Sequence, residues 1–214
     1  MKNKRKSLSD EVFEKLKNDI VNVRYKQGEF ITEAEVAHRF RISKTPAREA
    51  LNRLNVEGFV ESIPHKGYLV KSLSVNDILN LYQFRTILET ASIELAILYA
   101  SDKDLEQLEM MSSEKFIMND EEDYRRCAEA NYRFHMLIAK IGQNPLLVNA
   151  LSYVLNQLRR MLFLDLKNIN AEEISKDHQE IVRIIKRKDV DRAKELIKEH
   201  IKASQDRVFV YRMF

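Results

Sequence analysis

The sequence predicts a mostly α-helical protein with two parts: a head of three helices and one β-hairpin, followed by an antiparallel bundle of six helices. Three observations predict this fold class. The 214 residues include only 4 Gly and 3 Pro, a composition that disfavours long loops and all-β architectures. Apolar residues recur at helical spacing over most of the chain. Short β-like runs occur only between residues 59 and 70.

Three helices are predicted in the head. The first covers residues 8–23, where apolar side chains recur every three or four positions. The second covers residues 32–40 and opens with the capping box Thr-Glu-Ala-Glu. The third covers residues 43–57, because Ser43 can cap its start and a glycine follows its end.

A β-hairpin is predicted after the third helix. Residues 59–63 and 68–70 have strand-like sequences and flank a turn that contains Pro64 and Gly67. Only a few residues separate the second helix from the third. This order of elements within about 65 residues is typical of a winged helix-turn-helix. We therefore expect a DNA-binding domain over residues 1–72.

The expected partner of this domain is double-stranded DNA. A recognition helix enters the major groove with its N-terminal residues toward the base edges, and a basic wing can reach the neighbouring backbone. Residues 1–72 carry a net charge of +5, whereas the rest of the chain carries −2. The candidate DNA-binding residues are Ser43, Lys44, Thr45 and Arg48 on the helix and His65, Lys66 and Gly67 on the wing.

The remainder, residues 73–214, should form the helical bundle. No strand pattern occurs there, and short connections between helices favour antiparallel neighbours. The predicted helices cover residues 75–100, 102–117, 121–141, 145–167, 171–187 and 189–210.

Three histidines in the bundle suggest a metal site. His135, His178 and His200 each lie on the apolar side of a different predicted helix, and Asn131 lies one turn before His135 on the same face. Neutral imidazole is a frequent ligand of divalent transition metals. Three nitrogens with an open position would suit zinc, nickel or manganese together with a bound anion. For any one of these histidines, a hydrogen-bonded core position is the simpler interpretation.

The head resembles the DNA-binding domain of GntR-type regulators. The resemblance rests on the run from Ser43 to Leu51, on Glu57-Gly58 and on the wing sequence Pro64-His65-Lys66-Gly67. Family members often have Arg where this chain has Lys44, and lysine lacks the planar fork that binds guanine bidentately. Some relatives also have Arg in place of Ala34.

Residues 74–210 resemble the effector domain of the FadR-type branch, known as the FCD domain. Phe84-Arg85 and Leu88-Glu89 match its first-helix signature, and Asn131-x-x-Phe134-His135 matches an Asp-x-x-Phe-His motif. The resemblance implies Asn131, His135, His178 and His200 as metal ligands. An amide in place of Asp would leave the ion with one more positive charge, so metal affinity should fall or the preference for an anionic effector should rise.

Arg85 is the candidate effector-binding residue, because a guanidinium can bind a carboxylate bidentately. An internal ion pair with Glu89, one helical turn away, is the alternative. The expected protein is thus a homodimeric regulator that acts as a repressor, binds a pseudo-palindromic operator and responds to a small organic acid. A metal-free regulator for a larger acyl or sugar-derived ligand is a second hypothesis. A metal-dependent enzyme is a third, although the bundle offers no evident general base.

The sequence also indicates a location. No apolar run approaches the roughly 18 residues of a transmembrane helix, and the N-terminal residues lack the apolar segment of a secretory signal. Cys127 is the only cysteine, so the chain cannot form an internal disulfide. We expect a cytoplasmic protein without a membrane partner.

Overall fold

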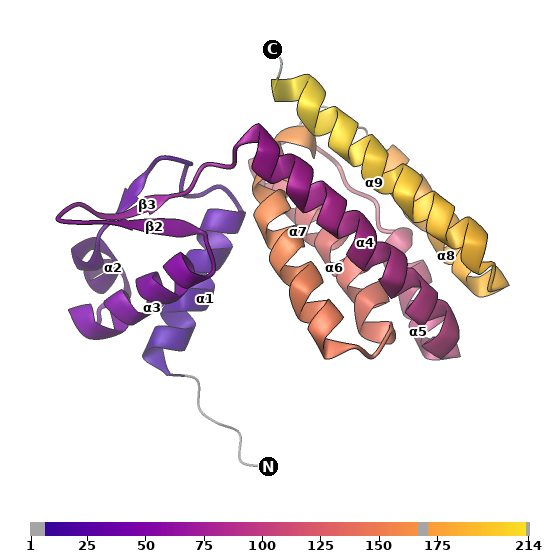
Figure 1. The fold of residues 1–214 in the computed structure, drawn as a ribbon, viewed down its shortest axis with the longest axis horizontal. Helices are drawn as coiled ribbons and strands as arrows, with labels where there is room; N and C mark the ends of the chain where they lie inside the picture. The colour runs from indigo at the N-terminus through magenta and orange to yellow at the C-terminus, as the bar shows by residue number, and fades with distance from the viewer. Residues whose placement is uncertain (1–6, 167–170, 213–214) are drawn as a thin grey trace. The chain divides into compact units, whose positions relative to one another are not determined.

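The computed structural model describes residues 7–166 and 171–212 and divides the chain into two compact units, Met1–Ser74 and Val75–Phe214 (Figure 1). The first unit combines helices with a small sheet. The second consists of helices wherever the structure describes it. This confirms the predicted fold class, and the division between the units falls after Ser74.

The first unit is built around a three-stranded antiparallel sheet with the strand order β1-β3-β2. Its elements are α1 (Leu8–Val21), β1 (Phe30–Ile31), α2 (Glu33–Phe40), α3 (Lys44–Val56), β2 (Val60–Ile63) and β3 (Gly67–Val70). The hairpin register places Ile63 opposite Gly67. The strand β1 was not predicted, because two residues are too short to show an alternating pattern.

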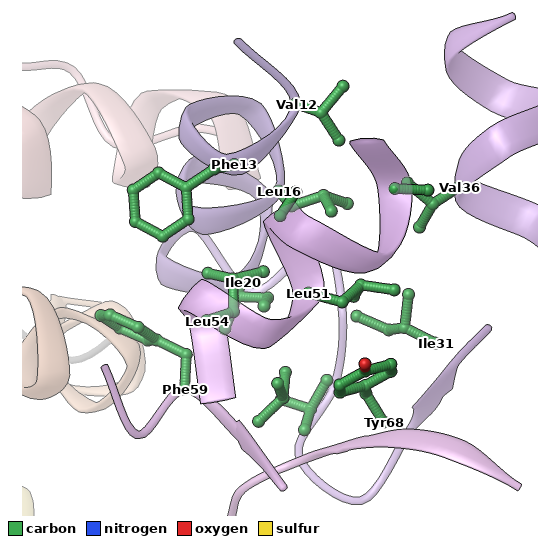
Figure 2. Packing of buried hydrophobic residues seen from close by; sticks show 14 of the residues in the cluster. Val12, Phe13, Leu16, Ile20, Ile31, Val36, Leu51, Leu54, Phe59 and Tyr68 are labelled. Carbon is green, nitrogen blue, oxygen red and sulfur yellow. The ribbon is translucent and has the colours of Figure 1, made fainter. Parts of the chain in front are cut away.

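One hydrophobic core holds the first unit together (Figure 2). Leu16 of α1 and Leu51 and Leu54 of α3 are fully buried, and Phe59 closes the core beside the sheet. Truncating such a leucine to alanine typically costs about 2–5 kcal/mol. Because the inner face of α3 is fixed in this way, its opposite face and its N-terminal turn are left for contacts with a partner.

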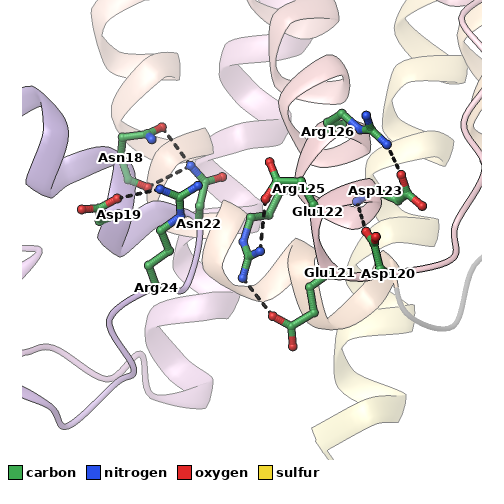
Figure 3. Close-up of polar contacts among 10 residues, drawn as sticks. All are labelled: Asn18, Asp19, Asn22, Arg24, Asp120, Glu121, Glu122, Asp123, Arg125 and Arg126. Carbon is green, nitrogen blue, oxygen red and sulfur yellow. Dashed lines mark hydrogen bonds and ion pairs between the residues drawn. The ribbon is translucent and has the colours of Figure 1, made fainter.

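A buried carboxylate joins α1 to α2. Asp19 is 3% exposed and accepts hydrogen bonds from Arg24 at 3.3 Å and from Arg39 at 2.6 Å. Figure 3 shows the first of these contacts. Since a buried charge must be paired, this arrangement fixes the last turn of α2 against α1.

The second unit packs its helices around α4. Its elements are α4 (Val75–Tyr99), α5 (Asp102–Ser112), α6 (Glu121–Ile141), α7 (Pro145–Leu166), α8 (Ala171–Arg187) and α9 (Val190–Arg212). The helix α4 packs against α6, α7 and α9, and α8 packs against α5 and α9. No helix in the described ranges is long and apolar enough to cross a membrane.

The predicted bundle helices agree with the structure except at some ends. The main difference is α5, which ends at Ser112 and not at residue 117. Residue 167, the predicted end of the fourth bundle helix, lies outside the described residues. The start of α6 is set by Asp120, whose side chain accepts a hydrogen bond from the backbone of Asp123 at 2.8 Å (Figure 3).

Candidate functional site

The N-terminal turn of α3 presents polar side chains to solvent. Ser43, Lys44 and Thr45 are all exposed. Ser43 occupies the N-cap position, but its side chain makes no capping hydrogen bond. Ser43 is therefore the N-cap residue, as predicted, but its hydroxyl does not satisfy a backbone amide of the first turn. The hydroxyl remains available for another acceptor or donor, and the helix terminus next to it favours a phosphate.

Arg48 is held by an acidic residue of the preceding helix. Its Nε donates to Oε1 of Glu33 at 2.8 Å, and its Nη2 donates to Oε2 at 2.9 Å. The hydrogen bond from Arg48 lowers the pKa of Glu33, so the carboxylate is ionised at neutral pH. Glu33 is the first residue of α2, and the pair therefore connects both helices of the motif.

The wing carries exposed residues at its tip. His65 and Lys66 are exposed, and His65 adopts a left-handed conformation with φ of 62°. Gly67 has a different role from its neighbours. Its φ is +107°, and a Cβ there would lie 2.8 Å from the backbone oxygen of Ile31. Gly67 thus allows β1 to approach the hairpin.

Three imidazoles converge inside the second unit. His135 of α6, His178 of α8 and His200 of α9 are buried, and their ring centroids lie 5.3 Å apart in each pair. One nitrogen from each ring lies within 4.8 Å of the others. The ring of His178 also stacks on Phe134 at 4.0 Å, which fixes its orientation. The structure therefore brings together the three histidines that the sequence singled out.

Carboxylates orient two of these rings. Nδ1 of His200 lies 3.1 Å from Oδ2 of Asp177. Nδ1 of His135 lies 2.6 Å from Oε2 of Glu89, a close contact whose angle is not that of an ideal hydrogen bond. A carboxylate partner at Nδ1 favours the tautomer that leaves the Nε2 lone pair free.

Arg85 lies next to the histidines and is 1% exposed. Its Nε donates to Oε1 of Glu89 at 2.6 Å, and its Nη2 lies 3.3 Å from Nε2 of His135. The ion pair considered from the sequence is therefore present. The Nη1 group of the same guanidinium is buried without a hydrogen-bond partner, as is Nε2 of His178. Buried polar atoms without partners are rare and call for an explanation such as a ligand or ion.

Burial sets the charge of the cluster. It lowers the pKa of His135 to about 4 and the pKa of His178 well below its ordinary value. Burial alone would raise the pKa of Glu89, but the adjacent His135 and Arg85 hold it well below its ordinary range. At neutral pH the two histidines are uncharged, which is the protonation state that binds metals.

Asn131 lies near one side of the cluster. It is half-buried and lines the same small cavity as His178 and Cys127. The cavity has room for about one water-sized group. A donor set of three imidazoles, with an amide on the same helix face as His135, fits a divalent transition metal better than a hard cation such as magnesium.

Sequence reasoning missed three residues at these sites. Glu33 gave no signal, because its partner Arg48 is 15 positions away. Glu89 was considered only as a partner of Arg85 and not of His135, which is 46 positions later. Asp177 precedes His178 in the chain but contacts His200 instead. The one signal in the sequence that could have suggested Asp177 is its position next to His178, a candidate metal ligand.

Two family models match the chain. The model described as bacterial regulatory proteins, gntR family, matches residues 8–70, and the FCD domain model matches residues 80–203. The first match covers the winged helix-turn-helix. The second covers all three histidines and Arg85, and by itself spans more than half of the chain.

Relatives have names that agree with these matches. A transcriptional regulator of Bacillus subtilis named YdhC, described as uncharacterized and HTH-type, is 31% identical over 88% of this chain and 85% of its own length. The Nta operon transcriptional regulator of Aminobacter aminovorans is 26% identical over 88% of each chain. The HTH-type transcriptional repressor RspR of Escherichia coli is 22% identical over 94% of this chain and 89% of its own.

Solved structures have the same fold. A transcriptional regulator described as GntR from Rhodococcus sp. RHA1 superposes with a TM-score of 0.81 at 18% identity and covers 95% of this chain and 98% of its own. McbR/YncC of E. coli gives a TM-score of 0.78 at 19% identity, with the same coverage. The fold, the family models and the relatives agree, and the chain belongs to the GntR family of DNA-binding transcription regulators, with an FCD effector domain and no enzymatic role.

Proposed function

We propose that this regulator is a repressor whose affinity for its operator is changed by a small carboxylic acid, bound at or near a divalent metal in the bundle. In this proposal Ser43, Lys44, Thr45 and Arg48 contact the operator from the major groove. His65, Lys66 and Gly67 contact the adjacent backbone or minor groove from the wing.

The observation that carries the proposal is that two buried atoms of different kinds lack hydrogen-bond partners. Nε2 of His178 is a nitrogen that can bind a metal, and Nη1 of Arg85 is a donor that can bind an anion. Both belong to the residues around the imidazole cluster. An acid whose carboxylate contacts the metal and the guanidinium would satisfy both requirements, since the guanidinium binds carboxylates bidentately.

His135, His178 and His200 would hold the metal through nitrogen, and Asn131 would add an oxygen. Zinc, nickel and manganese are the candidate ions. The ion would polarise the bound carboxylate as a Lewis acid. Because Nη2 of Arg85 now lies 3.3 Å from Nε2 of His135, metal binding would replace this contact and leave Nη2 for the acid.

The proposed active species is a homodimer in the cytoplasm. Two heads related by a two-fold axis would bind two half-sites of a pseudo-palindromic operator. The acid would change the affinity for the operator only to the extent that it binds one arrangement of the dimer better than the other.

The test is a DNA-binding titration. An operator is selected with the full chain from a random-sequence duplex library, and binding is followed by fluorescence anisotropy with and without zinc and a panel of mono-, di- and tricarboxylic acids. At least one acid should change the operator Kd severalfold in the presence of metal and should have a smaller effect on the Arg85→Met variant. An operator Kd that no metal and acid combination alters would contradict the sensing function.

A metal-free regulator of a larger ligand is the second candidate. The hydrogen bond between Arg85 and His135 favours it, because it satisfies one imidazole without an ion. Metal content measured by mass spectrometry, on protein purified without chelator, separates the two candidates.

A further inference from the structure

The position of Arg48 is determined by Glu33. The two hydrogen bonds between them, at 2.8 and 2.9 Å, form a bidentate pair that joins the first turn of α2 to α3. The carboxylate is the more buried partner, since the side chain of Glu33 is 25% exposed and that of Arg48 is 60% exposed. The guanidinium is therefore anchored on one side and exposed on the other.

The remaining donors of Arg48 form a second usable edge. A guanidinium has five N–H groups in one plane. Glu33 takes the N–H of Nε and one N–H of Nη2, which together form the side-on edge of the fork. Both N–H groups of Nη1 and the outer N–H of Nη2 are left. Guanine presents O6 and N7 side by side in the major groove, and this end-on edge can donate to both.

We propose that Glu33 is a positioning residue for base recognition, which holds Arg48 so that its end-on edge meets a guanine in the operator. Glu33 itself contacts no base in this proposal. Lys44, one turn earlier on α3, is exposed but has no planar fork, and Arg53 near the end of the helix is paired with Asp10, so Arg48 is the guanidinium near the N-terminus of α3 that is suited to read guanine. The inference rests on the proposed contact of α3 with the major groove.

If Glu33 did not position Arg48, its carboxylate would only repel the phosphate backbone of DNA. Exposed ion pairs often contribute little to stability, and a negative charge near DNA weakens binding to every sequence. Removal of Glu33 would then strengthen binding to all duplexes alike. In the positioning role, removal also frees a long side chain that must be ordered again on binding, which should lower the preference for the operator by about 3- to 10-fold.

The experiment compares Glu33→Ala with Glu49→Ala in the full chain. Glu49 is exposed on α3 next to Arg48, so both variants remove one negative charge from the same surface. Kd is measured by fluorescence anisotropy for the selected operator and for a scrambled duplex, at two salt concentrations. Both variants should bind the scrambled duplex more tightly than the wild-type chain. Only Glu33→Ala should lower the ratio of operator to scrambled affinity, by about 3- to 10-fold.

A double-mutant cycle removes the effect of any change in folding. In an Arg48→Ala background, Glu33→Ala should leave the affinity ratio unchanged, because there is no guanidinium to position. If Glu33→Ala and Glu49→Ala had the same ratio of operator to scrambled affinity, the inference would be overturned. It would also be overturned if Glu33→Ala lowered this ratio in the Arg48→Ala background. A wild-type chain with no preference for any duplex would overturn the contact of α3 with bases, and the role of Glu33 with it.

Discussion

Glu89 accepts a hydrogen bond from Nε of Arg85 at 2.6 Å, and both side chains are almost completely buried in the bundle. The second oxygen of Glu89 contacts His135, so one carboxylate supports both the candidate anion-binding residue and a candidate metal ligand. A buried ion pair of this kind contributes little to stability by itself, but the loss of one partner leaves the other charge unpaired.

The first prediction concerns this pair. Glu89→Ala should lower the free energy of unfolding by about 3–5 kcal/mol, because Arg85 would stay charged without a partner. The double variant Arg85→Met and Glu89→Leu should recover most of this loss, since it removes both charges and retains apolar volume. Urea denaturation followed by far-UV circular dichroism measures both. A double variant as unstable as Glu89→Ala would show that the pair does not act through its charges.

The second prediction is an acid instability of chelator-treated protein. The pKa of His135 is about 4 in the folded chain and ordinarily 6.5, and that of His178 is also lowered. Between these values the unfolded chain binds protons that the folded chain does not, so stability falls as the pH decreases from 6.5 toward 4. The slope should reach about 1.4 kcal/mol per pH unit for each histidine. Denaturation series at several pH values measure it, and His178→Phe should have the smaller slope.

The third prediction concerns the wing. Gly67→Ala should destabilise the chain by more than about 1 kcal/mol, since the new Cβ would meet the backbone of Ile31 and the φ of +107° disfavours a side chain. Gly28→Ala is the matched control. It also has a positive φ, but nothing lies within 4 Å of its added Cβ. Thermal unfolding should therefore show a larger loss of stability for Gly67→Ala than for Gly28→Ala. Equal losses of stability would mean that the close approach of β1 to Gly67 does not affect the stability of the chain.

The fourth prediction concerns Asn131. Replacing the amide by Asp adds a charged oxygen ligand, so Asn131→Asp should bind zinc more tightly, by about tenfold or more. It should also weaken the preference for acids with several negative charges, because the bound ion is then partly neutralised. Calorimetric titration with zinc, and then with mono- and dicarboxylic acids, measures both effects. A zinc Kd unchanged in both Asn131→Asp and Asn131→Ala would remove Asn131 from the site.

Local patterns predicted most of the fold. The capping box at Thr32 was visible in the sequence, and it is formed in the structure. The features that the sequence did not predict depend on long-range contacts. The helix α5 ends at Ser112, whose carbonyl accepts a hydrogen bond at 2.7 Å from Ser175, 63 positions later. No pattern near residue 112 contains this information.

The same distinction holds for the candidate sites. The apolar spacing around His135, His178 and His200 predicted that all three point inward, and the structure brings them together. Their partners were less predictable, since Asp177 faces His200 and not its own neighbour. Arg48 was predicted as a DNA-binding residue on the recognition helix, whereas its pairing with Glu33 depends on how α2 and α3 are packed.

A cobalt titration tests the central claim most directly, because Co²⁺ bound by imidazoles has visible absorption bands that report its ligands. Chelator-treated full-length protein should bind one Co²⁺ per chain, release it to zinc, and lose the bands in His178→Ala. His38→Ala, which alters an exposed histidine of the head, should behave as the wild-type chain. Spectra that stay those of aqueous cobalt, or that are the same for His178→Ala and the wild-type chain, would contradict a metal site at the three imidazoles.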